Sequence, residues 1–290
     1  MGGGREGPAR RATVIDVKKV QVDGLTLGYR ESGTGPPVLL LHGWPTSSLL
    51  WREVMVPIAR ANRVVAVDLP GFGASDKPLD VRYNFAFFDR VLDQFLARLG
   101  IEELGLAVHD LGGPIGLHWL LNRPGRVTRL ALLNTLVYPE FSEAVKEFIR
   151  ACAAPDASEK ITSPSGLEEI LRDGVADRAS LAPETLGALL EPFQTPESRR
   201  ALAAAGVGVE RRGFIEIAQK LPSLRVPVRV IYGERDRLLP DVATTMARVK
   251  TDLPRADVTA FPDRGHFIQL EAPEHVGDLL GRFFATESSG

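Results

Sequence analysis

Cysteine is almost absent from this chain, and long apolar runs are missing. The single cysteine, Cys152, has no second thiol with which to form an intramolecular disulfide. No stretch reaches the roughly 18 apolar residues of a membrane span, and the opening MGGGREGPARRAT lacks the apolar core of a signal peptide. We therefore expect a cytoplasmic protein with no membrane partner, Cys152 as a buried structural thiol, and a flexible tail over residues 1–13.

Charge of one sign is not in excess either. Lys and Arg total 35 against 37 Asp and Glu, a net charge of -2, which argues against a nucleic-acid partner. The 5 histidines show no metal-ligand spacing with a carboxylate or cysteine. Neither GxGxxG nor the Walker pattern follows a predicted strand. The sequence predicts no metal and no cofactor.

The chain is rich in short apolar runs that alternate with helical patterns. Five runs end near Gly, Asp, Asn or Pro and suit buried strands of a parallel sheet; they span residues 37–41, 63–67, 104–108, 129–133 and 226–232. Residues 84–100 place apolar side chains at helical spacing and stop at Gly100. The predicted fold class is α/β, a mostly parallel sheet flanked by helices.

One long segment interrupts this alternation. Residues 135–221 contain no convincing strand, only helical segments separated by prolines. The strand pattern then resumes, so an insertion between two strands of one sheet is the economical interpretation. We predict a core domain of residues 14–134 and 222–290, with residues 135–221 as a helical cap (lid) domain over the carboxyl ends of the strands.

The stretch VHDLGG places an aspartate where a strand turns sharply into a helix. Gly112 and Gly113 are small enough to allow that turn, which holds the side chain of Asp110 out at the head of the sheet. Backbone N–H groups at the start of a helix favour an ionised carboxylate there. A lone aspartate at such a site often serves only as a helix cap, so its role depends on what accompanies it.

Two downstream residues complete a catalytic set with Asp110. Asp236 follows a predicted strand in YGERDRLLP, with Glu234 nearby as a competing acid, and His266 precedes the final helix in GHFIQLEAPE. The order of Asp110, Asp236 and His266 is that of nucleophile, acid and base. We interpret these three as the catalytic residues.

The loop HGWP supplies the remaining part of the predicted site. The backbone N–H groups of Trp44 and Leu111 are expected to form an oxyanion hole beside the nucleophile. His42 and His109 lie next to these groups in sequence, and we expect structural hydrogen bonds from both.

These motifs together resemble a known group of enzymes. The segments HGWPTSSLLW, DLPGFGASDKP, VHDLGGPIG, YGERDRLLP and GHFIQLEAPE are similar to those of the α/β-hydrolase superfamily. Within it they resemble the haloalkane dehalogenase and epoxide hydrolase branch, which uses an aspartate nucleophile. The resemblance covers residues 15–135 and 222–287 and implies an α/β-hydrolase fold with an inserted helical cap.

An aspartate nucleophile suits attack on saturated carbon, because its attack on an ester would give a high-energy anhydride. Asp110 would displace a halide or alkoxide and become an alkyl ester. His266, oriented by Asp236, would then activate water to release an alcohol or a diol. The sequence thus predicts a hydrolase that acts on small, apolar, uncharged organic substrates, and it leaves the oligomeric state open.

The leaving group stays open between two branches. Dehalogenases of the family bind halide with a Trp after the nucleophile and a second donor, but Leu111 occupies that position here and Trp44 is the one indole near the site. Epoxide hydrolases of the family use two cap tyrosines, whereas residues 135–221 contain one tyrosine, Tyr138. Motif similarity favours a haloalkane dehalogenase, with an epoxide hydrolase, a non-catalytic ligand binder and oxygen chemistry on a heterocycle as alternatives.

An apolar pocket is expected beside the catalytic residues. We predict substrate contacts from Trp44, Tyr138, Phe141, Leu239 and Phe267. Further apolar residues expected near the pocket are Leu111, Leu238, Phe148, Phe193, Phe214 and Ile215.

Overall fold

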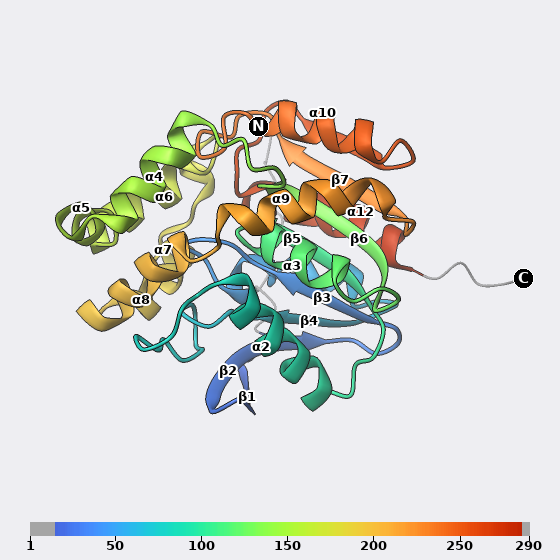
Figure 1. Cartoon of the computed structure of the whole chain (residues 1–290), viewed down its shortest axis with the longest axis horizontal. Coiled ribbons are helices and arrows are strands. Elements are labelled where there is room, and N and C mark those ends of the chain that lie inside the picture. The colour runs from blue at the N-terminus through green and yellow to red at the C-terminus, as the bar shows by residue number, and fades with distance from the viewer. Residues whose placement is uncertain (1–14, 286–290) are drawn as a thin grey trace, which may run out of the picture.

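A single eight-stranded sheet organises the molecule (Figure 1). The computed structural model describes residues 15–285, so the predicted tail at residues 1–13 lies outside the described part. The strands are β1 (Lys18–Val22), β2 (Leu25–Ser32), β3 (Pro37–Leu41), β4 (Arg63–Val67), β5 (Leu104–Asp110), β6 (Val127–Thr135), β7 (Val228–Gly233) and β8 (Asp257–Phe261). They lie in the order β1-β2-β4-β3-β5-β6-β7-β8, and β2 runs antiparallel to both of its neighbours.

Both faces of the central strands are buried, and successive residues face opposite layers. In β3, Val38 and Leu40 join one apolar cluster with α1 (Met55–Ile58) and α12 (Pro273–Phe284). Leu39 and Leu41 join a second cluster with α2 (Phe85–Arg98), α3 (Gly112–Leu121) and α10 (Val242–Asp252). Burial on both faces explains why these strands read as continuous apolar runs, and it confirms the predicted α/β class.

The edge of the sheet contains strands that the apolar runs did not reveal. β1 and β2 form a hairpin in which Val22 pairs with Leu25 across Asp23 and Gly24, both at positive φ. Their side chains are largely exposed or half-buried, so no unbroken apolar run marks them. The Asp-Gly pair is a known signal for a two-residue hairpin turn and was the available clue.

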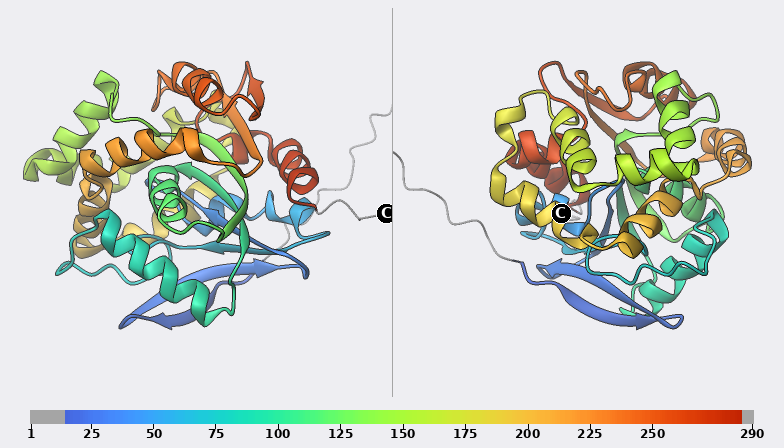
Figure 2. Two further views of the ribbon diagram at one scale, coloured as in Figure 1. Left: turned by 45° about the vertical axis from the view of Figure 1, so that its right-hand side comes forward. Right: turned by 90° about the vertical axis from the view of Figure 1, so that its left-hand side faces the viewer.

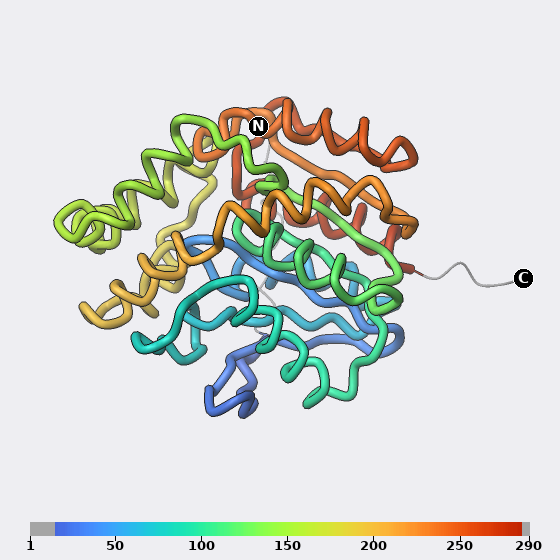
Figure 3. The backbone as a smooth tube through the Cα atoms, in the orientation of Figure 1, coloured from blue at the N-terminus to red at the C-terminus, as the bar shows by residue number. Residues whose placement is uncertain are grey.

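From the end of β6 to the start of β7 the described chain forms helices only. They are α4 (Glu143–Ala153), α5 (Pro155–Ile161), α6 (Pro164–Asp173), α7 (Pro183–Leu190), α8 (Pro196–Val207) and α9 (Arg211–Lys220), with short 3₁₀-helices at Arg178–Ser180, Glu191–Phe193 and Leu221–Ser223. Figure 3 traces this excursion through the green and yellow helices and back along α9. Four of these helices have a proline in the first turn, where its missing N–H costs no hydrogen bond.

The inserted helices do not all lie in one place. Figures 1 and 2 show α4 to α8 gathered beyond one end of the strands, while α9 runs back beside the sheet and contacts α3. The division into core and cap domains stays a prediction. A 3₁₀-helix at Ser48–Trp51 and the short α11 (Ile268–Glu271) complete the described elements, and no described helix is long and apolar enough to cross a membrane.

Candidate active site

Asp110 is the last residue of β5 and has a backbone conformation that side chains rarely adopt. Its φ is 48°, in the left-handed region, and α3 begins two residues later. A Cβ at Gly113 would overlap the hydroxyl of Thr135, which itself donates to the carbonyl of Asp110 over 2.7 Å. Position 113 therefore requires a glycine, because only then can Thr135 of β6 pack against this turn. The turn holds the carboxylate of Asp110 away from the sheet.

The carboxylate of Asp110 meets the two backbone groups that the sequence picked out. The N–H of Trp44 donates to Asp110 Oδ1 over 2.7 Å, and the N–H of Leu111 also favours the ionised form of this carboxylate. Gly43 makes the approach possible, because a Cβ there would overlap the carboxylate. Burial raises the pKa of Asp110, while His266 and the two N–H groups act in the opposite direction.

His266 is fully buried and lies between two carboxylates. Its Nδ1 is 2.8 Å from Asp236 Oδ2, and its Nε2 is 3.6 Å from Asp110 Oδ2. Burial alone would lower the pKa of His266, but the charge and hydrogen bond of Asp236, with the charge of Asp110, raise it overall. The bond to Asp236 makes Nδ1 the protonated nitrogen of the neutral ring, so Nε2 is left with a lone pair facing Asp110.

Asp236 is held by its own loop. Its Oδ1 accepts from the N–H groups of Leu238 and Leu239 over 2.9 and 2.7 Å. Its side chain is buried, whereas the competing Glu234 is exposed. The structure therefore brings Asp236, rather than Glu234, to the histidine.

Sequence reasoning missed Asn134, which also contacts Asp236. Its amide Nδ2 donates to Asp236 Oδ2 over 2.9 Å, and its Oδ1 accepts from the N–H of Gly233 over 3.0 Å. Asn134 is the extra residue of a bulge, since His109 pairs with Leu133 and Asp110 with Thr135. Its φ of 31° suits asparagine, and an Asn at the end of the apolar run 129–133 was the one available signal.

The two neighbouring histidines are neutral supports, as the sequence suggested. Burial lowers the pKa of both His42 and His109. His109 Nε2 donates to the carbonyl of His266 over 3.0 Å, and His42 Nε2 accepts from the N–H of Leu69 over 3.1 Å. His109 thereby fixes the backbone of His266, and His42 ties the HGWP loop to the loop after β4.

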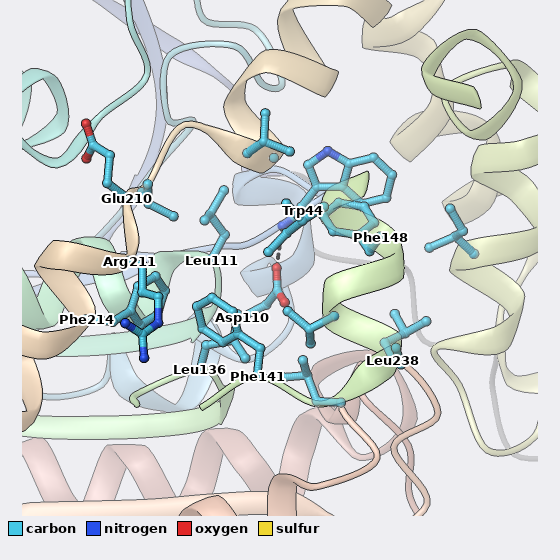
Figure 4. Close-up of a pocket in the computed structure, with 18 of the residues that line it drawn as sticks. Trp44, Asp110, Leu111, Leu136, Phe141, Phe148, Glu210, Arg211, Phe214 and Leu238 are labelled. Carbon is cyan, nitrogen blue, oxygen red and sulfur yellow. Dashed lines mark hydrogen bonds between the residues drawn. The ribbon is translucent and has the colours of Figure 1, made fainter. Parts of the chain in front are cut away.

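A cavity of about 550 Å³ opens onto Asp110 (Figure 4). Its walls are mostly aliphatic and aromatic and come from both the strand ends and the inserted helices. The lining residues include Trp44, Leu111, Leu136, Phe141, Val145, Phe148, Ile170, Val207, Phe214, Leu238 and Leu239. Trp44, Phe141 and Leu239 thus lie where substrate contacts were predicted.

Two predicted substrate contacts lie elsewhere. Tyr138 is buried and donates to Asp252 Oδ2 over 2.7 Å, on the side of α10, and it does not line the cavity. Phe267 is fully buried behind the histidine, with its ring centroid 4.8 Å from that of His266. The structure brings neither of these two side chains to the cavity, because sequence position does not give side-chain direction. Of the other residues predicted to lie near the pocket, Phe193 and Ile215 also do not line the cavity.

The indole of Trp44 is already engaged. Its Nε1 donates to the carbonyl of Leu202 on α8 over 3.1 Å, and its ring packs edge-on against Phe148. The indole N–H therefore ties the loop to an inserted helix and is not directed at the cavity. Trp44 was the one indole that the sequence placed near the site for a departing halide, and this bond engages its N–H.

This fold and site define the class of protein. Residues 36–152 match the family described as alpha/beta hydrolase fold. The chain has the fold of the α/β-hydrolase superfamily, as its motifs predicted. Across residues 15–285, no group of three or more His, Cys, Asp or Glu side chains is arranged to hold a metal ion.

Within that superfamily the similar proteins include haloalkane dehalogenases, which confirms the predicted branch. Haloalkane dehalogenase 2 of Mycobacterium tuberculosis is 29% identical over 255 residues, 87% of this chain and 89% of that protein. A haloalkane dehalogenase of Mesorhizobium japonicum is 32% identical over 67% of this chain and 64% of its own length. The crystal structure of haloalkane dehalogenase DbeA from Bradyrhizobium elkani superposes with a TM-score of 0.83 at 27% identity, over 94% of this chain and 98% of that one.

Proposed function

We propose that this hydrolase converts haloalkanes to alcohols through an ester on Asp110. The observation that supports this most is the arrangement of three features. The carboxylate of Asp110 accepts from the backbone N–H of Trp44, His266 Nε2 lies 3.6 Å from it, and it lines an apolar cavity. The names of its relatives point to the same reaction. The inserted helices, which supply much of the cavity wall, are proposed to act as its cap.

In the first step an oxygen of ionised Asp110 attacks the carbon that bears the halogen. A carbon–oxygen bond forms as the carbon–halogen bond breaks, and the halide leaves with the bonding electrons. The apolar walls leave the carboxylate few competing hydrogen bonds, which favours its attack. The product on the enzyme is a neutral alkyl ester of Asp110.

In the second step His266 Nε2 removes a proton from water, and the resulting hydroxide attacks the ester carbon of Asp110. The developing oxyanion accepts hydrogen bonds from the N–H groups of Trp44 and Leu111. Asp236 stabilises the imidazolium that forms, and Asn134 donates to the same carboxylate. Collapse of the tetrahedral species, with transfer of the proton from His266 to the departing alkoxide, releases the alcohol and leaves Asp110 as a carboxylic acid. That acid then loses its proton through His266 to solvent, which restores the carboxylate of Asp110.

The epoxide reaction is less favoured by the same site. An alkoxide leaving group needs a proton or strong donors, and Tyr138 is bonded to Asp252 instead. A pure ligand binder would not need a histidine that is buried between two carboxylates.

Halide release from bromoalkanes and chloroalkanes of equal length tests the proposal. We expect turnover in the wild-type protein and none in Asp110→Ala. Because the Trp44 indole N–H is engaged, a departing halide receives little help, so chlorides are expected to react at least about tenfold more slowly than bromides. Absence of halide release from every member of the set, with diol formed from epoxides, would overturn the proposal.

A further inference from the structure

The cavity at Asp110 has one cationic side chain that is neither used by the proposed reaction nor paired within the described residues. The charged residues that line it are Asp110, Glu210, Arg211 and Arg237. Arg237 is occupied, because its guanidinium donates to three backbone carbonyls at and just after the end of α6. Within residues 15–285, Arg211 has no hydrogen-bond or ion-pair partner for its side chain; the nearby ion pair to Glu216 belongs to Arg212.

Arg211 lies where the apolar wall meets solvent. It is the first residue of α9 and is exposed, whereas Phe214 on the next turn is buried in the cavity wall. Figure 4 shows Arg211 beside Phe214 and the Glu210 carboxylate directed away from the guanidinium. Although adjacent in sequence, the two side chains form no ion pair. An arginine in such a place covers apolar surface with its stem and keeps its charged head in water.

Resting on the proposed function, we propose that Arg211 binds the anionic end of an amphiphilic substrate. The substrate class is the ω-haloalkanoates: an apolar chain in the cavity, a terminal carbon–halogen bond at Asp110, and a carboxylate at Arg211. A guanidinium matches a carboxylate with two parallel hydrogen bonds. The apolar walls between the two ends fit the methylene chain.

The two charged ends of the cavity also determine which chain lengths suit it. A short haloacid such as bromoacetate would bring its carboxylate against ionised Asp110, and like charges in one site repel. A longer chain keeps the carboxylate away from Asp110 while the carbon–halogen bond reaches it. The preference for an anionic end is therefore expected to appear only as the chain lengthens.

Arg211 takes no part in the bonds that form and break. Such an interaction stabilises substrate and transition state equally, so its loss raises KM and leaves kcat unchanged. A charge-assisted hydrogen bond at a solvent boundary is expected to contribute about tenfold in kcat/KM, and added salt reduces that factor.

The test compares ω-bromohexanoate with n-hexyl bromide in three variants. In Arg211→Gln the ratio of kcat/KM for the acid over the neutral bromide should fall about tenfold. Arg212→Gln is the matched control, because Arg212 is adjacent, equally charged and outside the cavity lining, and its ratio should stay within about twofold. Glu210→Gln, which removes the neighbouring negative charge, should raise the ratio.

Binding of hexanoate, measured by calorimetry, separates this inference from the proposed function. If hexanoate binds more weakly to Arg211→Gln and to no other variant, the anion site is supported, whether or not the bromides are hydrolysed. If neither bromide is hydrolysed, the dehalogenase proposal is overturned instead. An unchanged ratio and unchanged hexanoate binding in Arg211→Gln would refute the anion site. An equal loss in Arg212→Gln would also refute it, because the effect would then be one of overall charge.

Discussion

At the scale of single residues, the charge of Asp110 regulates the basicity of His266. In the free enzyme the Asp110 carboxylate helps to raise the pKa of His266. Once Asp110 is alkylated, that negative charge is gone, and the pKa of His266 should fall. The proposed alkylation therefore favours the neutral form of His266, which is the form that can remove a proton from water.

An NMR titration of His266 checks this coupling. Asp110→Asn replaces the carboxylate by a neutral group of the same shape, as the ester does. The pKa of His266 is expected to be lower in Asp110→Asn than in the wild type, and ester hydrolysis should rise with pH through the lower value. Equal pKa values in the two proteins would show that Asp110 does not control the base.

Asn134 offers a second test at this scale. Asn134→Asp keeps the shape and tolerates positive φ, but it replaces the donor to Asp236 by a carboxylate that repels it. We expect hydrolysis of the ester to slow by about ten- to hundredfold, with alkylation nearly unchanged. Stopped-flow kinetics should then show a halide burst followed by slow turnover. Loss of the burst itself would mean that Asn134 acts on the first step.

At the scale of elements, the turn from β5 to α3 depends on close packing against β6. The hydroxyl of Thr135 occupies the space that a side chain at Gly113 would need. The same hydroxyl bonds the carbonyl of Asp110, so the packing and the strained φ of Asp110 support each other.

Gly113→Ala is therefore expected to reduce the free energy of unfolding by about 1–3 kcal/mol through overpacking, and to lower activity. Gly187→Ala in α7 is the control, since a Cβ there meets nothing within 4 Å. That change should stabilise the protein by about 0.5–1 kcal/mol, because alanine favours a helix. Denaturant titration of both variants measures this, and a neutral Gly113→Ala would contradict the packing account.

Elements differ in how far the sequence predicted them. β3 and β4 have the bounds of their apolar runs, because both of their faces are buried. The β1–β2 hairpin lies at a half-exposed edge, so its pattern is diluted by polar side chains. The segment between β6 and β7 was predicted to be helical, but the bounds of its helices were not predicted. The prolines that separate its helical patterns in the sequence begin helices in the structure.

At the scale of the whole molecule, chain order predicted which proposed catalytic groups would meet but not which residues would form the cavity walls around them. Asp110 ends a strand, and Asp236 and His266 each follow one. Parallel strands deliver their carboxyl ends to one edge, so the meeting of these residues was predictable. The direction of Tyr138 and the bond from the Trp44 indole to Leu202 depend on how the inserted helices pack. No local pattern encodes that packing.

The intact mass of His266→Gln after exposure to bromoalkanes tests the central claim most directly. Without its base, the protein should stall as the ester and gain the mass of one alkyl group, and Asp110→Ala should gain none. An unmodified His266→Gln, or the same gain in Asp110→Ala, would contradict an aspartyl ester at this site.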